Sequence, residues 1–377
     1  MRQQFGCNMA YMIRLIPAAS AATAGLGVAC ILVCGGAALA GPVPDYDFQW
    51  ATVGAAGNRP ANIDEAPGFF PPLSTPALHI GRVDYEFRIA RTEVTVGQWF
   101  EFAEAFWPHW GGSYQDVALT GRWITPASNV PGQDPGFQIV QGAANRPADT
   151  SWIMAARYVN WLHNGKGTAA SDFENGVYDI STVVQGPGGA WGGPETRAPD
   201  ATFWLPSNDE WTKAMFYDPN KNGPGQEGYW RYPHTSDNAP ISGLPWEGGE
   251  TSAGEALDVF GPYLDVGSYP NSMSPWGLLD GSGSEREWAE TAVDGSRVIR
   301  GSRRAALFHD VFDSVDYFGG SFPNAPVAGF RVASVVPAPS GFLSMGIVLL
   351  LAQPRGRRSR KTRRTSVDPV EASRRGG

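Results

Sequence analysis

The sequence predicts an α+β fold, in a single loop-rich domain with few short helices and strands. Helical periodicity is confined to three short segments, and the strand signals between them are brief. Glycine (47 residues) and proline (31 residues) are frequent, and both interrupt regular structure. The 14 tryptophans supply large apolar anchors, which a chain with so many loops needs to form a core. Between Asp45 and Val336 we find no linker long enough to separate two domains.

Each expected helix begins at a polar N-cap residue. Thr95 and Gln98 form a capping box that opens a helix to about Phe106, with apolar residues on one face. Ser151 opens a second helix that runs through Leu162. A second capping box at residues 207–210 is followed by Trp211, Ala214 and Met215 at helical spacing.

Strands are expected in three places, and most of the remaining chain is predicted to be loop. The candidate strands are Tyr85–Ala90, Arg297–Arg300 and Gly329–Ser334. The stretch Gly186–Pro194 is an example of the loops, because glycine and proline dominate it.

Residues 1–40 have the order of a secretory signal peptide. Arg2 and Arg14 are followed by an uncharged, apolar and small-residue stretch, and residues 38–40 (Ala-Leu-Ala) provide a cleavage site. An uncleaved membrane anchor is the alternative. It is disfavoured because Gly and Ala lower the hydrophobicity of the stretch and because a cleavage site ends it. Cys30 after Ala29 is a weak lipoprotein signal.

The other end of the chain, residues 337–364, has the order of a sorting segment. Pro337 and Pro339 precede an uncharged run at 341–352, and seven Lys and Arg residues follow at 355–364. The run is too short to cross a bilayer core of about 30 Å comfortably, and the basic cluster fits a stop on the cytoplasmic side. The arrangement resembles the PEP-CTERM signal, which an exosortase processes, although Ala338 stands where that signal has Glu. Residues 365–377 are expected to be disordered.

A nucleic-acid-binding tail is the alternative interpretation of the basic cluster. That interpretation does not explain the apolar run that precedes the cluster. The two ends hold 11 of the 29 Lys and Arg residues and two of the 37 Asp and Glu residues, so residues 41–336 carry a formal net charge of −17. This charge argues against nucleic acid and anionic membrane as partners of the domain. Membrane contact is expected only transiently, through the two ends.

The predicted domain, residues 41–336, contains no cysteine. The three cysteines, Cys7, Cys30 and Cys34, all lie in the predicted signal peptide. The domain therefore forms no disulfide despite an oxidising destination, and it has no thiol chemistry.

Seven segments, spread over about residues 46–334, resemble motifs of the formylglycine-generating enzyme (sulfatase-modifying factor) family. In order they are Glu93–Trp99, Arg146–Trp152 with Asn160–Leu162, Trp204–Trp211, Val266–Pro270 with Trp276–Leu278, Asp280–Trp288, Arg297–Gly301 and Gly329–Val332. The resemblance implies a variant of the C-type lectin fold, which is rich in loops. Within these motifs we expect Trp152, Trp161, Trp204, Trp211 and Trp288 to be core anchors, and Arg331 to be a buried ion-pair partner.

The resemblance also implies a calcium site in the turn that begins at Asp280. Calcium takes six to eight oxygen ligands, and a glycine-rich turn with carboxylates can supply them. The matching positions give side-chain oxygens at Asp280 and Glu287 and carbonyl oxygens at Gly283 and Glu285. Ser284 and Arg286 replace the family's usual Asn and aromatic residue. A solvated acidic loop is the alternative, because the pattern alone is weakly specific.

Catalysis in the family depends on two cysteines that follow the Arg297–Gly301 motif, hold a copper ion and bind the substrate cysteine. Their positions fall near Ala306 and Val311 in this chain. Neither side chain can ligate copper or exchange a disulfide, since Cu(I) needs thiolate or thioether ligands. We therefore expect no catalytic residue of the family type, and no copper.

Other chemistries have little support in the sequence. The five histidines show no H-x-H or H-E-x-x-H spacing, and neither a G-x-S-x-G elbow nor a Walker-type phosphate loop occurs. The sequence does not decide whether two carboxylates are paired for glycoside hydrolysis, because that activity depends on the distance between them in space.

Three functions follow from these observations. The first is a non-catalytic binding or envelope protein, exported and sorted to the cell surface, with a carbohydrate, protein or polymer ligand. The second is an enzyme, either a formylglycine-type oxidase with displaced chemistry or another activity in the same pocket. The third, a structural protein of the extracellular matrix, differs from the first only in its partner.

Overall fold

The computed structural model describes residues 43–66, 80–113, 116–127, 136–254 and 262–337. The predicted signal peptide, the sorting segment apart from Pro337, and the tail lie outside the described residues. Within the described ranges, helices and strands are short and loops connect them, as an α+β domain requires. In the same ranges, the search for a membrane-spanning helix found none of sufficient length and hydrophobicity.

Six α-helices lie in the described ranges, and three of them are those expected from the sequence. Their bounds are α1 Val96–Phe106, α2 Val117–Thr120, α3 Trp152–His163, α4 Ala170–Glu174, α5 Asn208–Phe216 and α6 His309–Phe312. Short 3₁₀ turns occupy Trp107–His109, Ile180–Thr182 and Pro245–Glu247.

The predicted N-caps are confirmed. The Thr95 hydroxyl accepts a hydrogen bond from the Gln98 N–H, and the Gln98 side chain accepts one from the Thr95 N–H, which completes the capping box of α1. Ser207 and Glu210 cap α5 in the same way. The Ser151 side chain caps α3. Such caps satisfy the N–H groups that a helix leaves unpaired at its start.

The strands form two main antiparallel sheets and two small hairpins. The four-stranded sheet has the order β1 (Trp50–Val53), β2 (Phe87–Ala90), β11 (Ala333–Ser334) and β5 (Phe203–Trp204); the three-stranded sheet has the order β10 (Gly319–Ser321), β9 (Ser296–Arg300) and β8 (Glu287–Val293). The hairpins pair β3 (Ile124–Pro126) with β4 (Phe137–Ile139), and β6 (Tyr217–Asp218) with β7 (Gly228–Tyr229).

Pairing in the four-stranded sheet joins the two ends of the domain. Ile89 of β2 lies opposite Ala333 of β11 in antiparallel register. The predicted strand Gly329–Ser334 is therefore regular only in its last two residues. Before them, Ala328 and Gly329 form isolated bridges to Thr150 and Glu287, so this segment connects several elements instead of following one neighbour.

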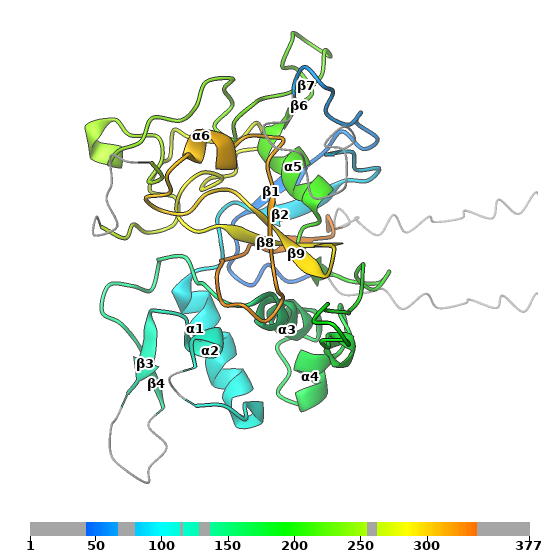
Figure 1. Cartoon of the computed structure of the whole chain (residues 1–377), viewed down its shortest axis with the longest axis vertical. Helices are drawn as coiled ribbons and strands as arrows, with labels where there is room; N and C mark the ends of the chain where they lie inside the picture. Colours follow the sequence, from blue (N-terminus) through cyan, green and yellow to red (C-terminus); the bar gives the residue numbers. More distant parts are fainter. Residues whose placement is uncertain (1–42, 67–79, 114–115, 128–135, 255–261, 338–377) are drawn as a thin grey trace, which may run out of the picture. The chain divides into compact units, whose positions relative to one another are not determined.

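The three-stranded sheet lies between two helices (Figure 1). On one side α5 packs against β8 and β9. On the other side Trp152, at the start of α3, donates its indole N–H to the Ala289 carbonyl of β8, while the Arg297 guanidinium lies 3.8 Å from the Trp152 ring. The loops that leave this sheet build the cavity described below.

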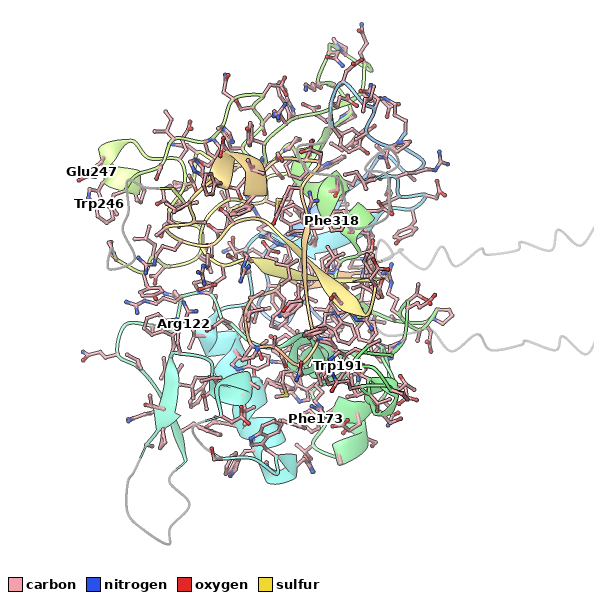
Figure 2. All side chains as sticks on the ribbon, in the orientation of Figure 1. Arg122, Phe173, Trp191, Trp246, Glu247 and Phe318 are labelled. Carbon is pink, nitrogen blue, oxygen red and sulfur yellow. The ribbon has the colours of Figure 1, made fainter. Side chains whose placement is uncertain are left out.

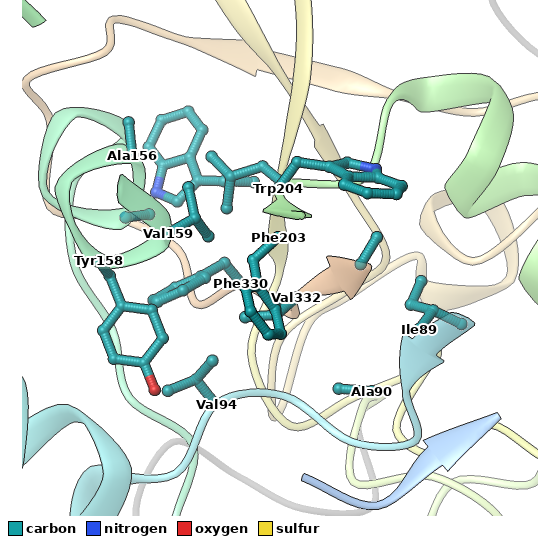
Figure 3. Close-up of a cluster of buried hydrophobic side chains, with 14 of the residues drawn as sticks. Ile89, Ala90, Val94, Ala156, Tyr158, Val159, Phe203, Trp204, Phe330 and Val332 are labelled. Carbon is teal, nitrogen blue, oxygen red and sulfur yellow. The ribbon is translucent and has the colours of Figure 1, made fainter. Parts of the chain in front are cut away.

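Aromatic side chains dominate the core. The five tryptophans predicted as anchors are each at most 3 % exposed, which confirms the prediction. Figure 3 shows Phe330 among side chains of α3 and of the β5 strand, and its ring meets Tyr158 edge-on at 5.3 Å between centroids. Edge-to-face pairs of this kind add to the free energy gained by burying the rings.

Arg331 is a buried ion-pair partner, as expected. Its guanidinium donates to both oxygens of Glu287, with Nε 2.6 Å from Oε2, and both side chains are at most 1 % exposed. The same guanidinium donates to the carbonyls of Ala90, Arg91 and Leu279. One buried cation thus holds the start of β8, the end of β2 and the turn before Asp280 together.

We predict that Arg331→Met destabilises the domain, because it leaves the Glu287 carboxylate buried without its cation. The free energy of unfolding, measured by urea denaturation, should fall by about 3–5 kcal/mol. Arg82→Met is the control, since it breaks the exposed Arg82–Asp84 pair and should cost less than about 1 kcal/mol. Equal losses in the two variants would contradict the prediction.

Candidate functional site

A cavity of about 830 Å³ lies beside the three-stranded sheet. Its wall includes the loop after β9, residues 301–308, together with the β10 strand. Four arginines line it: Arg122, Arg286, Arg303 and Arg304. We call this cavity the arginine cleft. A pocket of this size is in the range that holds small organic ligands, roughly 300–1,000 Å³.

Both positions expected for the family cysteines lie at this cleft or next to it. Ala306 lines the arginine cleft. Val311 lies in α6, whose last residue, Phe312, also lines the cleft. The cleft wall therefore offers a methyl group at Ala306, with an isopropyl group nearby in α6. These residues do not fit a copper site, because neither side chain has a sulfur atom to ligate the metal.

An ion-pair cluster forms one side of the cleft. Arg122, labelled in Figure 2, lies between α2 and β3 in the chain and binds two carboxylates, with 2.7 Å to Glu285 and 3.0 Å to Asp149. Glu285 is 6 % exposed. Burial raises the pKa of Glu285 to about 7, although the Arg122 guanidinium opposes the shift. Glu285 is also the one carboxylate among the described residues that line the cleft.

Arg286 and Arg303 bring two positive charges close together on the cleft wall. Arg286 donates one hydrogen bond, from Nη2 to the Val327 carbonyl, while its buried Nε has no partner among the described residues. Burial, and then the charge of Arg303, lower the pKa of Arg286. Arg304 stacks over the Tyr263 ring at 4.1 Å.

The backbone around the cleft is strained. Ser284, Ala305 and Phe308 adopt left-handed conformations, with φ of 57°, 55° and 59°. Residues other than glycine avoid this region, at a cost of about 1–3 kcal/mol each, and such residues gather at functional sites. Phe308 is also 70 % exposed at the cleft. The surrounding fold therefore holds this loop in a shape that its residues alone do not favour.

The residues expected to bind calcium lie in one turn and the strand that follows it. Asp280 is buried and in the left-handed region, and its Oδ2 accepts the Gly267 N–H at 2.7 Å. The Glu287 carboxylate accepts from Arg331 at both oxygens and also from the Trp211 indole at 3.0 Å. These bonds use three of the roughly four lone-pair positions of the carboxylate.

Glu93 adds a third carboxylate near Asp280 and Glu287, and the sequence analysis did not single it out. Its Oε2 is buried without a partner among the described residues. Burial, with repulsion from Asp280 and Glu287, raises the pKa of Glu93 well above its usual value. Over the described ranges, the search for metal-binding groups of three or more His, Cys, Asp or Glu side chains found none. Calcium binding stays a prediction.

Two further buried carboxylates lie outside the predicted calcium turn. Asp313 accepts hydrogen bonds from the Ser302 N–H, at 2.7 Å, and from the hydroxyls of Ser282 and Ser302. Glu290 pairs with Arg197 at 2.9 Å. Burial raises the pKa of Asp313 to about 6 and that of Glu290 to about 7.

These shifts predict that the domain loses stability as pH rises. The folded state holds protons that the unfolded state has released, so the stabilisation is complete below about pH 4 and is lost as pH passes through about 6–7. Burial lowers the pKa of His234, which acts in the opposite direction. The melting temperature should therefore be higher at pH 5 than at pH 7.5.

Asp313→Asn should flatten this dependence, because the amide does not titrate. The matched control is Asp64→Asn, at an exposed carboxylate, which should keep the parental slope. Thermal denaturation of the three proteins at both pH values checks the prediction, and a parental slope in Asp313→Asn would refute it.

Sequence reasoning located the cleft loop but missed most of its charged wall. Arg303 and Arg304 were visible as a pair directly after the β9 motif, and Arg286 as a departure from an aromatic position. Arg122 and Tyr263 gave no signal, because they come from segments far from that motif in the chain.

The model of the sulfatase-modifying factor enzyme 1-like domain matches residues 31–336. Among solved structures, similarity was found to CarF (19 % identity, TM-score 0.43, covering 77 % of this chain and 99 % of that chain) and to PvdO from Pseudomonas aeruginosa (17 %, 0.42, 76 % and 94 %). Variable protein 1 of Treponema denticola is also similar (14 %, 0.43, 77 % and 95 %). A search of curated proteins found no match.

The three structural similarities are too low to support an argument about function. The family model, in contrast, spans most of the chain, including every motif segment and the arginine cleft. The chain belongs to the sulfatase-modifying factor (formylglycine-generating enzyme-like) family.

Proposed function

We propose that this protein is a non-catalytic binding or envelope protein, exported and sorted to the cell surface, which holds its ligand in the arginine cleft. The observation that carries the proposal is the composition of the cleft loop. Where the family's catalytic cysteines are expected, this chain has Ala306 in the wall and Val311 in the adjacent helix. The sequence of residues 41–336 contains no thiol that could replace the family's cysteines.

Export and sorting rest on the two ends of the chain. The proposed signal peptide ends at Ala40, and the proposed sorting segment, with an exosortase-type enzyme as processing partner, begins at Pro337. Both the strong negative charge of residues 41–336 and this route favour an extracellular ligand over nucleic acid. Mass spectrometry of the mature chain, whose first residue we expect to be Gly41, tests the route.

An enzyme that uses the same pocket is the second candidate. The buried carboxyl of Glu285, whose pKa burial raises to about 7, favours it, because acid–base catalysts have pKa values near the working pH. Glycoside hydrolysis by two carboxylates is less well supported, since it needs a second carboxylate facing the first across the substrate. Among the described residues, only Glu285 supplies a carboxylate to the cleft wall.

We predict that the purified full-length chain does not convert a peptide containing C-x-P-x-R to an aldehyde in the presence of oxygen and copper. No thiolate is present in the domain to hold Cu(I) or the substrate cysteine. Aldehyde formation is measured by hydrazide labelling and mass spectrometry, with a cysteine-containing member of the family as positive control. Turnover above the blank would contradict the non-catalytic proposal.

We also propose calcium as a structural ion at the turn that begins at Asp280, with oxygens from Asp280, Gly283, Glu285 and Glu287. A bound cation would offset the repulsion among the buried carboxylates there. An ion that binds only the folded state stabilises it by mass action, by about 2.7 kcal/mol at a hundred times its dissociation constant.

A chelator should therefore lower the melting temperature, and added calcium should restore it. Asp280→Asn should lose this response, whereas Asp47→Asn, at an exposed carboxylate, should keep it. Calorimetric scans with EDTA and with calcium check the prediction. If the parental protein, shown by elemental analysis to hold no ion, does not respond to calcium, the site is absent.

A further inference from the structure

The charge of the arginine cleft is opposite to that of the protein around it. Residues 41–336 carry a net charge of −17, yet among the described residues the cleft wall combines four arginines with a single carboxylate, Glu285. Arg122 is occupied by Glu285 and Asp149, so the positive charge that we consider for a ligand comes from Arg303 and from Arg286. A positively charged cleft on an acidic protein favours a ligand whose negative group enters the cleft itself.

Two of these guanidinium groups have hydrogen-bonding capacity to spare. In the described part of the chain, Arg303 forms no side-chain hydrogen bond or ion pair and is exposed, and the buried Nε of Arg286 has no partner. Both arginines lie on the wall of the same cleft. A carboxylate between them would accept paired N–H bonds, the arrangement that suits the planar guanidinium, and would remove their repulsion.

Four aromatic side chains also line the cleft in the described part of the chain. Tyr263, Phe308, Phe312 and Tyr317 contribute rings to the wall, and Phe308 is held 70 % exposed by a strained backbone. Exposed ring faces attract the C–H groups of a sugar ring, because the face carries partial negative charge. The volume of about 830 Å³ suits a short oligosaccharide.

Two other classes of ligand fit less well. A long, densely charged polymer such as nucleic acid would be repelled by the acidic surface outside the cleft. A peptide could extend the sheet at β10, the outer strand that lines the cleft. However, β10 is only three residues long, which leaves few backbone groups for pairing with an added strand.

We propose that the arginine cleft binds a short acidic sugar chain, with the carboxylate of a uronic acid held by Arg303 and Arg286 and a sugar ring against Phe308. This inference rests on the proposed binding function and specifies its ligand. The ligand also differs in charge from the peptide substrate of the family, because the arginine of a C-x-P-x-R peptide would meet the like charges of Arg303 and Arg286.

The test is isothermal titration of the full-length chain with a trimer of galacturonic acid. The matched ligand is the same trimer with its carboxylates methyl-esterified, which keeps the rings and removes the charge. We expect the acidic trimer to bind at least tenfold more tightly than the ester, and its binding to weaken as salt rises from 50 to 300 mM, roughly as for other contacts between exposed charges.

Variants assign the binding to the cleft. Arg303→Gln should weaken binding of the acidic trimer by about tenfold, since it removes a charge-assisted hydrogen bond, and should leave the weak binding of the ester unchanged. Phe308→Ala should weaken the binding of both the acidic trimer and its ester. Arg82→Gln, at an exposed arginine outside the cleft, should bind like the parental chain.

Equal affinity for the trimer and its ester, or parental affinity in Arg303→Gln, would overturn the inference while leaving a neutral-ligand binding function intact. Tighter binding of a tri-glutamate peptide than of the trimer would overturn it in favour of an acidic peptide. Only aldehyde formation from the C-x-P-x-R peptide would remove the non-catalytic function itself, so the two failures can be told apart.

Discussion

The buried pair of Glu287 and Arg331 is the interaction on which the rest of the structure depends. A charged pair in the core is stable only when hydrogen bonds satisfy its remaining donors and acceptors. Here the carbonyls of Ala90, Arg91 and Leu279 and the Trp211 indole complete the set. The pair thereby fixes where β8 begins, and with it the turn that carries Glu285 and Arg286 to the cleft.

The arginine cleft has cations and aromatic rings on its wall, where the sequence resemblance led us to expect sulfur ligands. The loop after β9 lines the cavity and brings Ala306, Arg303 and Arg304 to the wall. Its left-handed residues and the exposed Phe308 are maintained by neighbours that are themselves well buried, such as Ser302 bonded to Asp313. A cavity lined by cations and aromatic rings is suited to holding an anion, and the proposed acidic sugar ligand follows from that character.

Much of the fold could be predicted from local sequence. The starts of the helices at 96–106, 152–163 and 208–216 were predicted correctly, because their N-cap side chains act over only three positions. The ends of the first two were predicted within a residue. The strand expected at 329–334 was predicted too long, because Phe330 and Arg331 bind the core by their side chains instead of continuing the ladder. The seven-residue strand β8 was missed, since its first residue had been assigned to a metal-binding turn.

By itself, the sequence determined the fold class, the family motifs, the aromatic anchors and the absence of thiols, since each of these depends on residue identity or on spacing within one segment. The tertiary structure alone decided the character of the site. Arg122, Tyr263 and Arg303 come from segments separated by up to 181 positions in the chain, and nothing local marks them as neighbours. Their common cavity exists because long-range pairing, such as that of Ile89 with Ala333, closes the chain around a core that no single segment could form.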